Sequence, residues 1–103
     1  MKEFIAEEKL QSLRKSIDNI DTSLIYMLAE RFKCTDQIGI LKAVFQLPAI
    51  DSTREDEQSR RMSVLAVELD INPKLLNGIF RVIIGEVVSR HEKAAENLAL
   101  KMC

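Results

Sequence analysis

Three cationic side chains stand among the regularly spaced apolar residues of the first half of the chain: Arg14, Arg31 and Lys42. Arg31 takes an apolar position of this pattern, between Met27 and Cys34. A buried guanidinium needs an anionic partner, because an unpaired charge is costly to remove from water. The partner is either a carboxylate of the protein or a bound anionic ligand, and periodicity alone leaves both open.

The spacing of the three cations has a geometric consequence. If they share one helix, all three face one general side, and at a rise of ~1.5 Å per residue Arg31 lies roughly 16 Å from Lys42. Arg14 lies roughly 42 Å from Lys42 along the same helix and cannot reach its site within one chain. An antiparallel second copy of the helix would bring its own Arg14 alongside. This predicts a symmetric dimer with two equivalent anion sites.

Two further groups have types and positions that suit a binding site. Asp51, Arg54 and Glu55 have i,i+3 and i,i+4 spacings, which place them on one face of the first turn of a helix. Acids there also have an ordinary role in helix capping and dipole stabilisation. His91, the sole histidine, follows Val87 by four residues on a predicted apolar face. Both structural and functional roles stay open for it.

The elements that must position these residues are three helices. Apolar residues with alternating spacings of three and four form a heptad pattern, which we call the apolar seam, and it predicts one helix of about 36–40 residues. The seam consists of Leu10, Leu13, Ile17, Ile20, Leu24, Met27, Cys34, Ile38, Leu41 and Phe45, with Arg31 inside it.

Two breaks divide the chain after this first helix. Residues 46–51 contain Pro48, and Ser52 to Glu55 form an S-x-x-E capping box, with Asp51 as the rival N-cap. The second helix is expected to carry an apolar face and to end near Asp70. Asn72-Pro73 predicts the start of a third helix that reaches about Leu98. The two faces comprise Met62, Leu65, Ala66 and Leu69, then Leu76, Ile79, Phe80, Ile83, Ile84, Val87 and Val88.

Length and composition indicate an all-α single domain over residues 1–103. With three glycines and two prolines there is little to punctuate a sheet. A helix of roughly 55–60 Å is too long to be buried in a compact monomer of this length, whose radius of gyration would be about 13 Å. The first helix therefore needs a second chain, and we expect an interlocked homodimer.

Charge and cysteine content exclude several classes of function. Fifteen basic against sixteen acidic residues give no general basic field, so we expect no nucleic-acid partner. No apolar run approaches the ~20 residues of a membrane span, and the acidic first ten residues do not resemble a signal peptide, so we expect a cytoplasmic protein with no membrane partner. Cys34 and Cys103 lack metal-type spacing and are expected to stay reduced, so no metal site is predicted.

These residues, in this order, resemble the all-helical class of chorismate mutases over about residues 10–92. The resemblance rests on L-R-x-x-I-D-x-I-D at residues 13–21, L-x-x-R at residues 28–31, Lys42, and D-x-x-R-E at residues 51–55. It implies an interlocked homodimer of three-helix chains in which each active site takes one arginine from the other subunit. It also implies rearrangement of chorismate to prephenate, for phenylalanine and tyrosine biosynthesis, with no cofactor.

The resemblance also implies roles for the residues. Arg14 of the second chain and Arg31 would hold the two substrate carboxylates, Lys42 would face a carboxylate and the ether oxygen, and Glu55 would bind the ring hydroxyl. Asp51 and Arg54 would line the same end. Better-known relatives carry glutamine at the position of His91 and a small polar residue at that of Val87. We therefore predict His91 as the second donor to the ether oxygen, neutral or protonated, beside Lys42 and Arg31 as catalytic residues.

Three other functions stay open. An isochorismate-pyruvate lyase uses a similar cationic pocket on the same fold. A non-catalytic helical dimer could bind a partner or metabolite, with a pocket that has decayed at Val87 and His91. A structural coiled-coil module would need only the apolar seam, but it leaves Arg31 within the seam unexplained.

Overall fold

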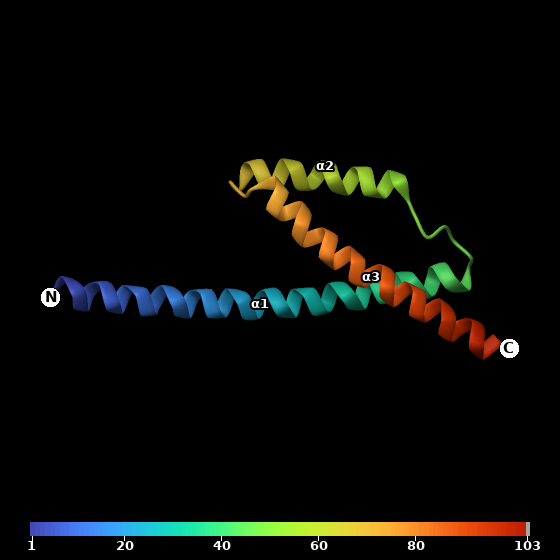
Figure 1. The fold of residues 1–103 in the computed structure, drawn as a ribbon, viewed down its shortest axis with the longest axis horizontal. Helices are drawn as coiled ribbons and strands as arrows, with labels where there is room; N and C mark the ends of the chain where they lie inside the picture. The colour runs from blue at the N-terminus through green and yellow to red at the C-terminus, as the bar shows by residue number, and fades with distance from the viewer. Residues whose placement is uncertain (103) are drawn as a thin grey trace. The chain divides into compact units, whose positions relative to one another are not determined.

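The computed structural model describes residues 1–102, with side chains up to Lys101, so the prediction for Cys103 lies outside the described residues. The described chain forms three helices and no strand: α1 (Lys2–Val44), α2 (Ser52–Glu68) and α3 (Pro73–Met102) (Figure 1). The predicted all-α class and very long first helix are confirmed. None of these helices is both long and apolar enough, over the described residues, to cross a membrane.

The predicted length of about 36–40 residues for the first helix is too short, because α1 begins at Lys2 and has 43 residues. The residues before Leu10 are mainly Glu, Lys and Ala, which favour helix without needing an apolar face. The helix therefore extends beyond the apolar seam. Likewise α3 continues past Leu98 to Met102.

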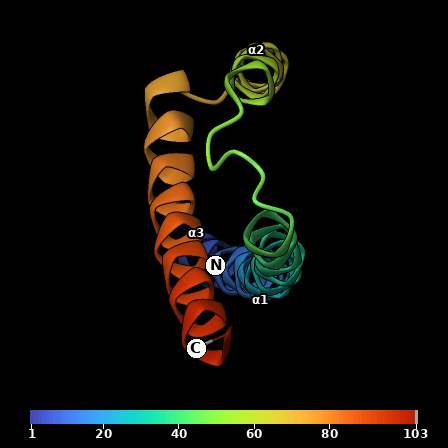
Figure 2. The ribbon, with the colours of Figure 1, turned by 90° about the vertical axis from the view of Figure 1, so that its right-hand side faces the viewer.

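Contacts divide the chain into two compact units, Met1–Cys34 and Thr35–Cys103. The first unit is a single stretch of α1, on which most side chains are exposed. In the second unit α2 contacts α3, and α3 then runs past the last turns of α1, residues 35–44 (Figures 1 and 2). These last turns, α3 and the link between α1 and α2 carry the candidate site. The predicted single domain over 1–103 stays a prediction.

The end of α1 is a left-handed turn. Gln46 has a φ of 54°, and the Leu47 amide donates to the Lys42 carbonyl at 2.9 Å. This is the pattern of a Schellman motif, which stops a helix and reverses the chain. The predicted break after Phe45 is confirmed, and the turn sends residues 47–50 back beside Lys42.

The start of α2 decides between the two predicted caps. Asp51 is the N-cap: its backbone is extended, with φ −119°, and its Oδ1 accepts a hydrogen bond from the Arg54 amide at 3.1 Å. The capping box with Ser52 as N-cap is therefore wrong, because Ser52 is already the first residue of the helix. The carboxylate one position earlier takes the free first-turn amide.

The start of α3 follows the prediction. The Asn72 side-chain oxygen accepts from the Lys74 amide at 3.0 Å, and Pro73 takes the first helical position. The preceding α2 ends in a second Schellman turn, with Asp70 at φ 54° and the Ile71 amide donating to the Ala66 carbonyl at 2.9 Å. Both connections are thus fixed by local hydrogen bonds.

A single chain buries little apolar surface. Among the described residues, Ala66 is the one fully buried apolar side chain, and Gly39 is also buried. Four of the seven residues on the predicted face of α3 are half-buried: Leu76, Phe80, Ile83 and Val87. The apolar seam stays open, with Ile20 65% and Leu24 59% exposed.

Candidate functional site

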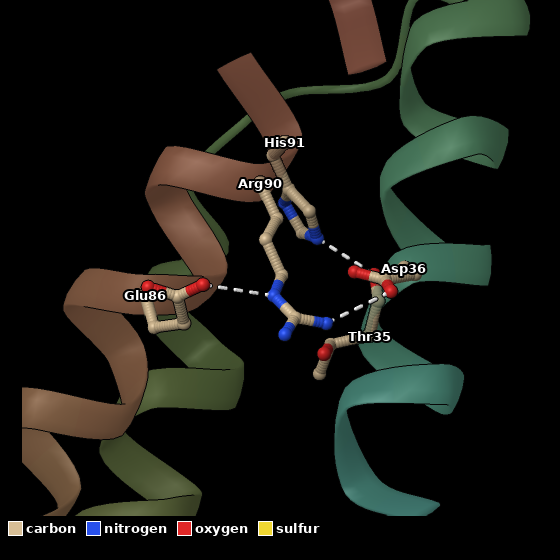
Figure 3. Close-up of polar contacts among 5 residues, drawn as sticks. All are labelled: Thr35, Asp36, Glu86, Arg90 and His91. Carbon is tan, nitrogen blue, oxygen red and sulfur yellow. Dashed lines mark hydrogen bonds and ion pairs between the residues drawn. The ribbon is translucent and has the colours of Figure 1, made fainter. Parts of the chain in front are cut away.

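The site is built where α3 passes α1. His91 Nε2 lies 2.7 Å from the backbone carbonyl oxygen of Thr35 (Figure 3). A carbonyl oxygen only accepts, so Nε2 carries the hydrogen and donates it. Gly39, one turn further along α1, leaves the space for the ring: a Cβ on Gly39 would overlap His91 Cδ2 and lie 2.9 Å from Nε2.

An ion-pair cluster lies next to this contact. Arg90 Nη1 donates to Asp36 Oδ2 of α1 at 3.1 Å, and Arg90 Nε donates to Glu86 Oε1 of α3 at 3.0 Å (Figure 3). The hydrogen bond to Glu86 raises the pKa of Arg90 above its usual range, and the charge of Asp36 adds to this. Arg90 therefore stays charged and holds α3 against α1 beside His91.

A cavity of about 480 Å³ opens between the end of α1, the link after it and the second half of α3. Lys42 and His91 both line it, so the structure brings together two of the three residues predicted to be catalytic. Most of the remaining wall is apolar. The lining residues are Gly39, Lys42, Ala43, Leu47, Ala49, Ile50, Val88, His91, Glu92 and Ala95.

The charges of the cavity are mixed. Lys42 is half-buried, and its Nζ donates to the Ala49 carbonyl at 3.0 Å across the turn that ends α1. Glu92 contributes a carboxylate to the same wall. An anionic ligand in this cavity would therefore be attracted by the ammonium group of Lys42 and repelled by the carboxylate of Glu92.

The three predicted residues of α2 lie on its exposed first turn. Asp51 caps the helix, and the Glu55 amide donates to the Asp51 carbonyl at 3.0 Å. Arg54 and Glu55 are exposed, and neither lines the cavity. This turn directly follows Ile50, which does line it.

The remaining predicted residues are placed as follows. Arg14 is exposed and Arg31 is half-buried, both on the first unit of α1. Val87 is half-buried but is not among the residues that line the cavity, whereas Val88 is. A substrate contact of Val87 stays a prediction.

Sequence reasoning missed four participants: Gly39, Glu92, and the pair of Asp36 with Arg90. Only Gly39 gave a usable signal, since an isolated glycine inside a helical pattern often marks a close approach. The charged residues look like any solvated helix face in the sequence. Asp36 and Arg90 pair across 54 positions, which no local pattern reveals.

Comparisons with known proteins agree with this architecture. Residues 13–92 match the family described as chorismate mutase type II. A curated relative, "Chorismate mutase" from Methanocaldococcus jannaschii, is 29% identical over 94 residues, covering 91% of this chain and 90% of the relative. The chain belongs to the chorismate mutase type II family.

Two relatives are longer proteins. The "T-protein" of Enterobacter agglomerans is 28% identical over 87% of this chain, which spans 24% of that protein. A "Bifunctional chorismate mutase/prephenate dehydratase" of Aquifex aeolicus is 34% identical over 71% of this chain, spanning 18% of that protein. Family and relatives identify the chain as an isomerase of the chorismate mutase type and do not favour the lyase, the non-catalytic binder or the structural module.

Proposed function

We propose that this chain rearranges chorismate to prephenate in a symmetric homodimer, with its cavity as part of the active site. The observation that carries the proposal is the meeting of Lys42 and His91 in one cavity of a chain that belongs to this family. The pathway leading to phenylalanine and tyrosine is the proposed context. The cytoplasmic location remains as the sequence predicts it.

The reaction is an intramolecular Claisen rearrangement: the ether C–O bond breaks while a new C–C bond forms. All atoms stay in one molecule, so neither a nucleophile nor a cofactor is required. The protein must hold a flexible dianion in its compact shape and stabilise the charge that develops on the ether oxygen. Cations and hydrogen-bond donors at fixed positions supply both functions.

The roles follow from the charges. We propose that Lys42 leaves the Ala49 carbonyl and donates to the substrate carboxylate and ether oxygen. Arg31 binds a carboxylate, since a guanidinium matches a carboxylate with two parallel hydrogen bonds. Glu55 accepts from the ring hydroxyl, while Asp51 and Arg54 line that end, a proposal supported by their place directly after the cavity wall.

Val87 offers no hydrogen bond, so it contributes shape alone to the proposed site. Replacing it with serine would add a hydroxyl. We expect Val87→Ser to lower KM for chorismate, with kcat little changed. An unchanged KM would mean that Val87 does not touch the substrate.

The dimer is proposed to complete each site with Arg14 from the second chain. Two observations support it: the apolar seam is exposed along α1, and a single chain buries almost no large apolar side chain among its described residues. If the apolar seams of two copies pack against each other, both seams are removed from water in a single interface. Cross-linking or sedimentation at micromolar concentration tests this directly.

His91 can act as the second donor in two ways. Its Nε2–H can move from the Thr35 carbonyl to the substrate, or a protonated ring can donate through Nδ1 while Nε2–H stays in place. The charged groups around it are Lys42 and Glu92 on the cavity wall, with Asp36 and Arg90 beside it. Only the second way makes the rate depend on protonation of the imidazole.

The testing experiment follows loss of chorismate and formation of prephenate by the parent and by Arg31→Ala. Arg81→Ala is the matched control, because Arg81 is exposed on α3 and is not placed in the site. We expect the parent and Arg81→Ala to form prephenate and Arg31→Ala to lose nearly all activity. A folded parent that leaves chorismate unchanged would contradict the proposal, and pyruvate release from isochorismate would then identify the lyase.

A further inference from the structure

We propose that Gly39 is a positioning residue, which sets the imidazole of His91 on the Thr35 carbonyl and thereby fixes which ring nitrogen carries the proton. This inference rests on the proposed function, because it assigns to Gly39 the control of a group in the proposed active site.

The contact geometry carries the first step. Gly39 is the buried residue of α1, and a Cβ built on it would overlap Cδ2 of His91, lie 2.9 Å from Nε2 and 3.0 Å from Cγ. The obstacle is a rigid aromatic ring, and real Cβ atoms essentially never come this close to it. Any side chain at position 39 therefore displaces the imidazole.

The second step concerns the Thr35 carbonyl. In an α-helix the carbonyl of residue 35 accepts the amide hydrogen of residue 39. His91 Nε2 lies 2.7 Å from the same oxygen, so this carbonyl accepts from both groups. The His91 ring can reach this carbonyl on the side of α1 because position 39, one turn further along the helix, is a glycine and has no side chain to cover the backbone.

The third step links this contact to the state of the ring. Because Nε2–H donates to a carbonyl, the neutral ring keeps its hydrogen on Nε2 and an acceptor lone pair on Nδ1. A displaced ring loses this constraint and takes either tautomer. Gly39 thus controls both the place and the donor character of His91 without touching the reacting atoms.

Two other glycines supply matched controls. Gly78 and Gly85 lie on α3, and nothing stands within 4 Å of a Cβ built on either. Gly85→Ala makes the same chemical change as Gly39→Ala, on the helix that carries His91, but with open space around it. We expect Gly85→Ala to leave the parent's kcat/KM unchanged.

The first measurement is nitrogen-15 NMR of the imidazole in the parent protein, which is unambiguous because the chain has one histidine. We expect the neutral ring to be the Nε2–H tautomer. Gly39→Ala should lose this signature, while Gly85→Ala keeps it. A parent ring in the Nδ1–H tautomer, or a signature that Gly39→Ala leaves unchanged, would overturn the proposal.

The second measurement is a double-mutant cycle on kcat/KM. We expect Gly39→Ala to lower kcat/KM to the level of His91→Ala, and the double variant to be no worse than His91→Ala alone. An equal further loss in the His91→Ala background would show that Gly39 does not act through His91. If Gly39→Ala fails to fold, the double variant should fold again, since the colliding ring is gone; continued misfolding would refute the proposal.

Failure of the proposed function gives a different result. A parent that does not convert chorismate refutes the enzyme assignment. The NMR comparison of Gly39→Ala with Gly85→Ala still decides whether position 39 holds the imidazole.

Discussion

Replacement of Lys42 by methionine separates the catalytic from the structural contribution of this side chain. Methionine keeps most of the apolar stem and removes the ammonium group. In the structure Nζ makes one hydrogen bond, to the Ala49 carbonyl at 3.0 Å, on a half-buried residue. Loss of one such bond costs about 1 kcal/mol of the free energy of unfolding.

The expected loss of catalysis is much larger. A charged donor placed where negative charge develops lowers the activation barrier by about 3–4 kcal/mol, which raises kcat roughly 10²–10³-fold. The two losses therefore differ by about 2–3 kcal/mol. This gap is the quantity to measure, because a merely structural lysine would show none.

The assay combines steady-state kinetics over a range of chorismate concentrations with urea unfolding at one fixed protein concentration. Lys93→Met is the control: Lys93 is exposed on α3 near His91 but does not line the cavity. We expect its kcat/KM to stay within about threefold of the parent, a change of less than 1 kcal/mol. A Lys42→Met variant that stays within the same range, or a Lys93→Met variant that loses as much, would refute the reasoning.

Three further predictions concern caps, ion pairs and pH. Asp51→Ala and Asn72→Ala each remove an N-cap, and each should lower the free energy of unfolding by about 1 kcal/mol in denaturation curves. Only Asp51→Ala should also alter KM, so equal effects on KM would contradict a site role for Asp51. Arg90→Met should lower the midpoint of urea denaturation more than Lys33→Met does, because Arg90 joins two helices while the partner of Lys33, Glu30, lies one turn away on the same helix. Equal losses would argue against a clamp between helices. If protonated His91 is the donor, kcat/KM should fall as pH rises, and His91→Gln should flatten the profile; a flat parent profile would leave only the neutral donor.

Much of the fold could be predicted because helix ends are local events. The break after Phe45 and the cap at Asn72 follow from a few neighbouring residues, and the structure confirms both. The two errors were also local. The predicted length of the first helix is too short because helix propensity extends beyond an apolar pattern, and the Ser52 cap is wrong because two adjacent residues compete for the same amides.

The candidate site was predicted only in part. Lys42 and His91 were selected from their positions in the sequence, and the structure places both on one cavity wall. Their partners, the Ala49 carbonyl and the Thr35 carbonyl, were out of reach because backbone groups carry no sequence signature. Glu92 was missed because a carboxylate on a helix looks solvated until the facing wall is known.

By itself the sequence determined the three helices, the cap at Asn72 and the family, because these depend on residue type and on spacings of three, four or seven positions. The tertiary structure decided where α3 crosses α1: at Gly39, with His91 on the Thr35 carbonyl and Arg90 on Asp36. Periodicity fixes which side of a helix is apolar. It does not determine the point along the helix axis at which another helix crosses. That point is set by contacts between residues 54 and 56 positions apart, where a missing side chain leaves room for a ring.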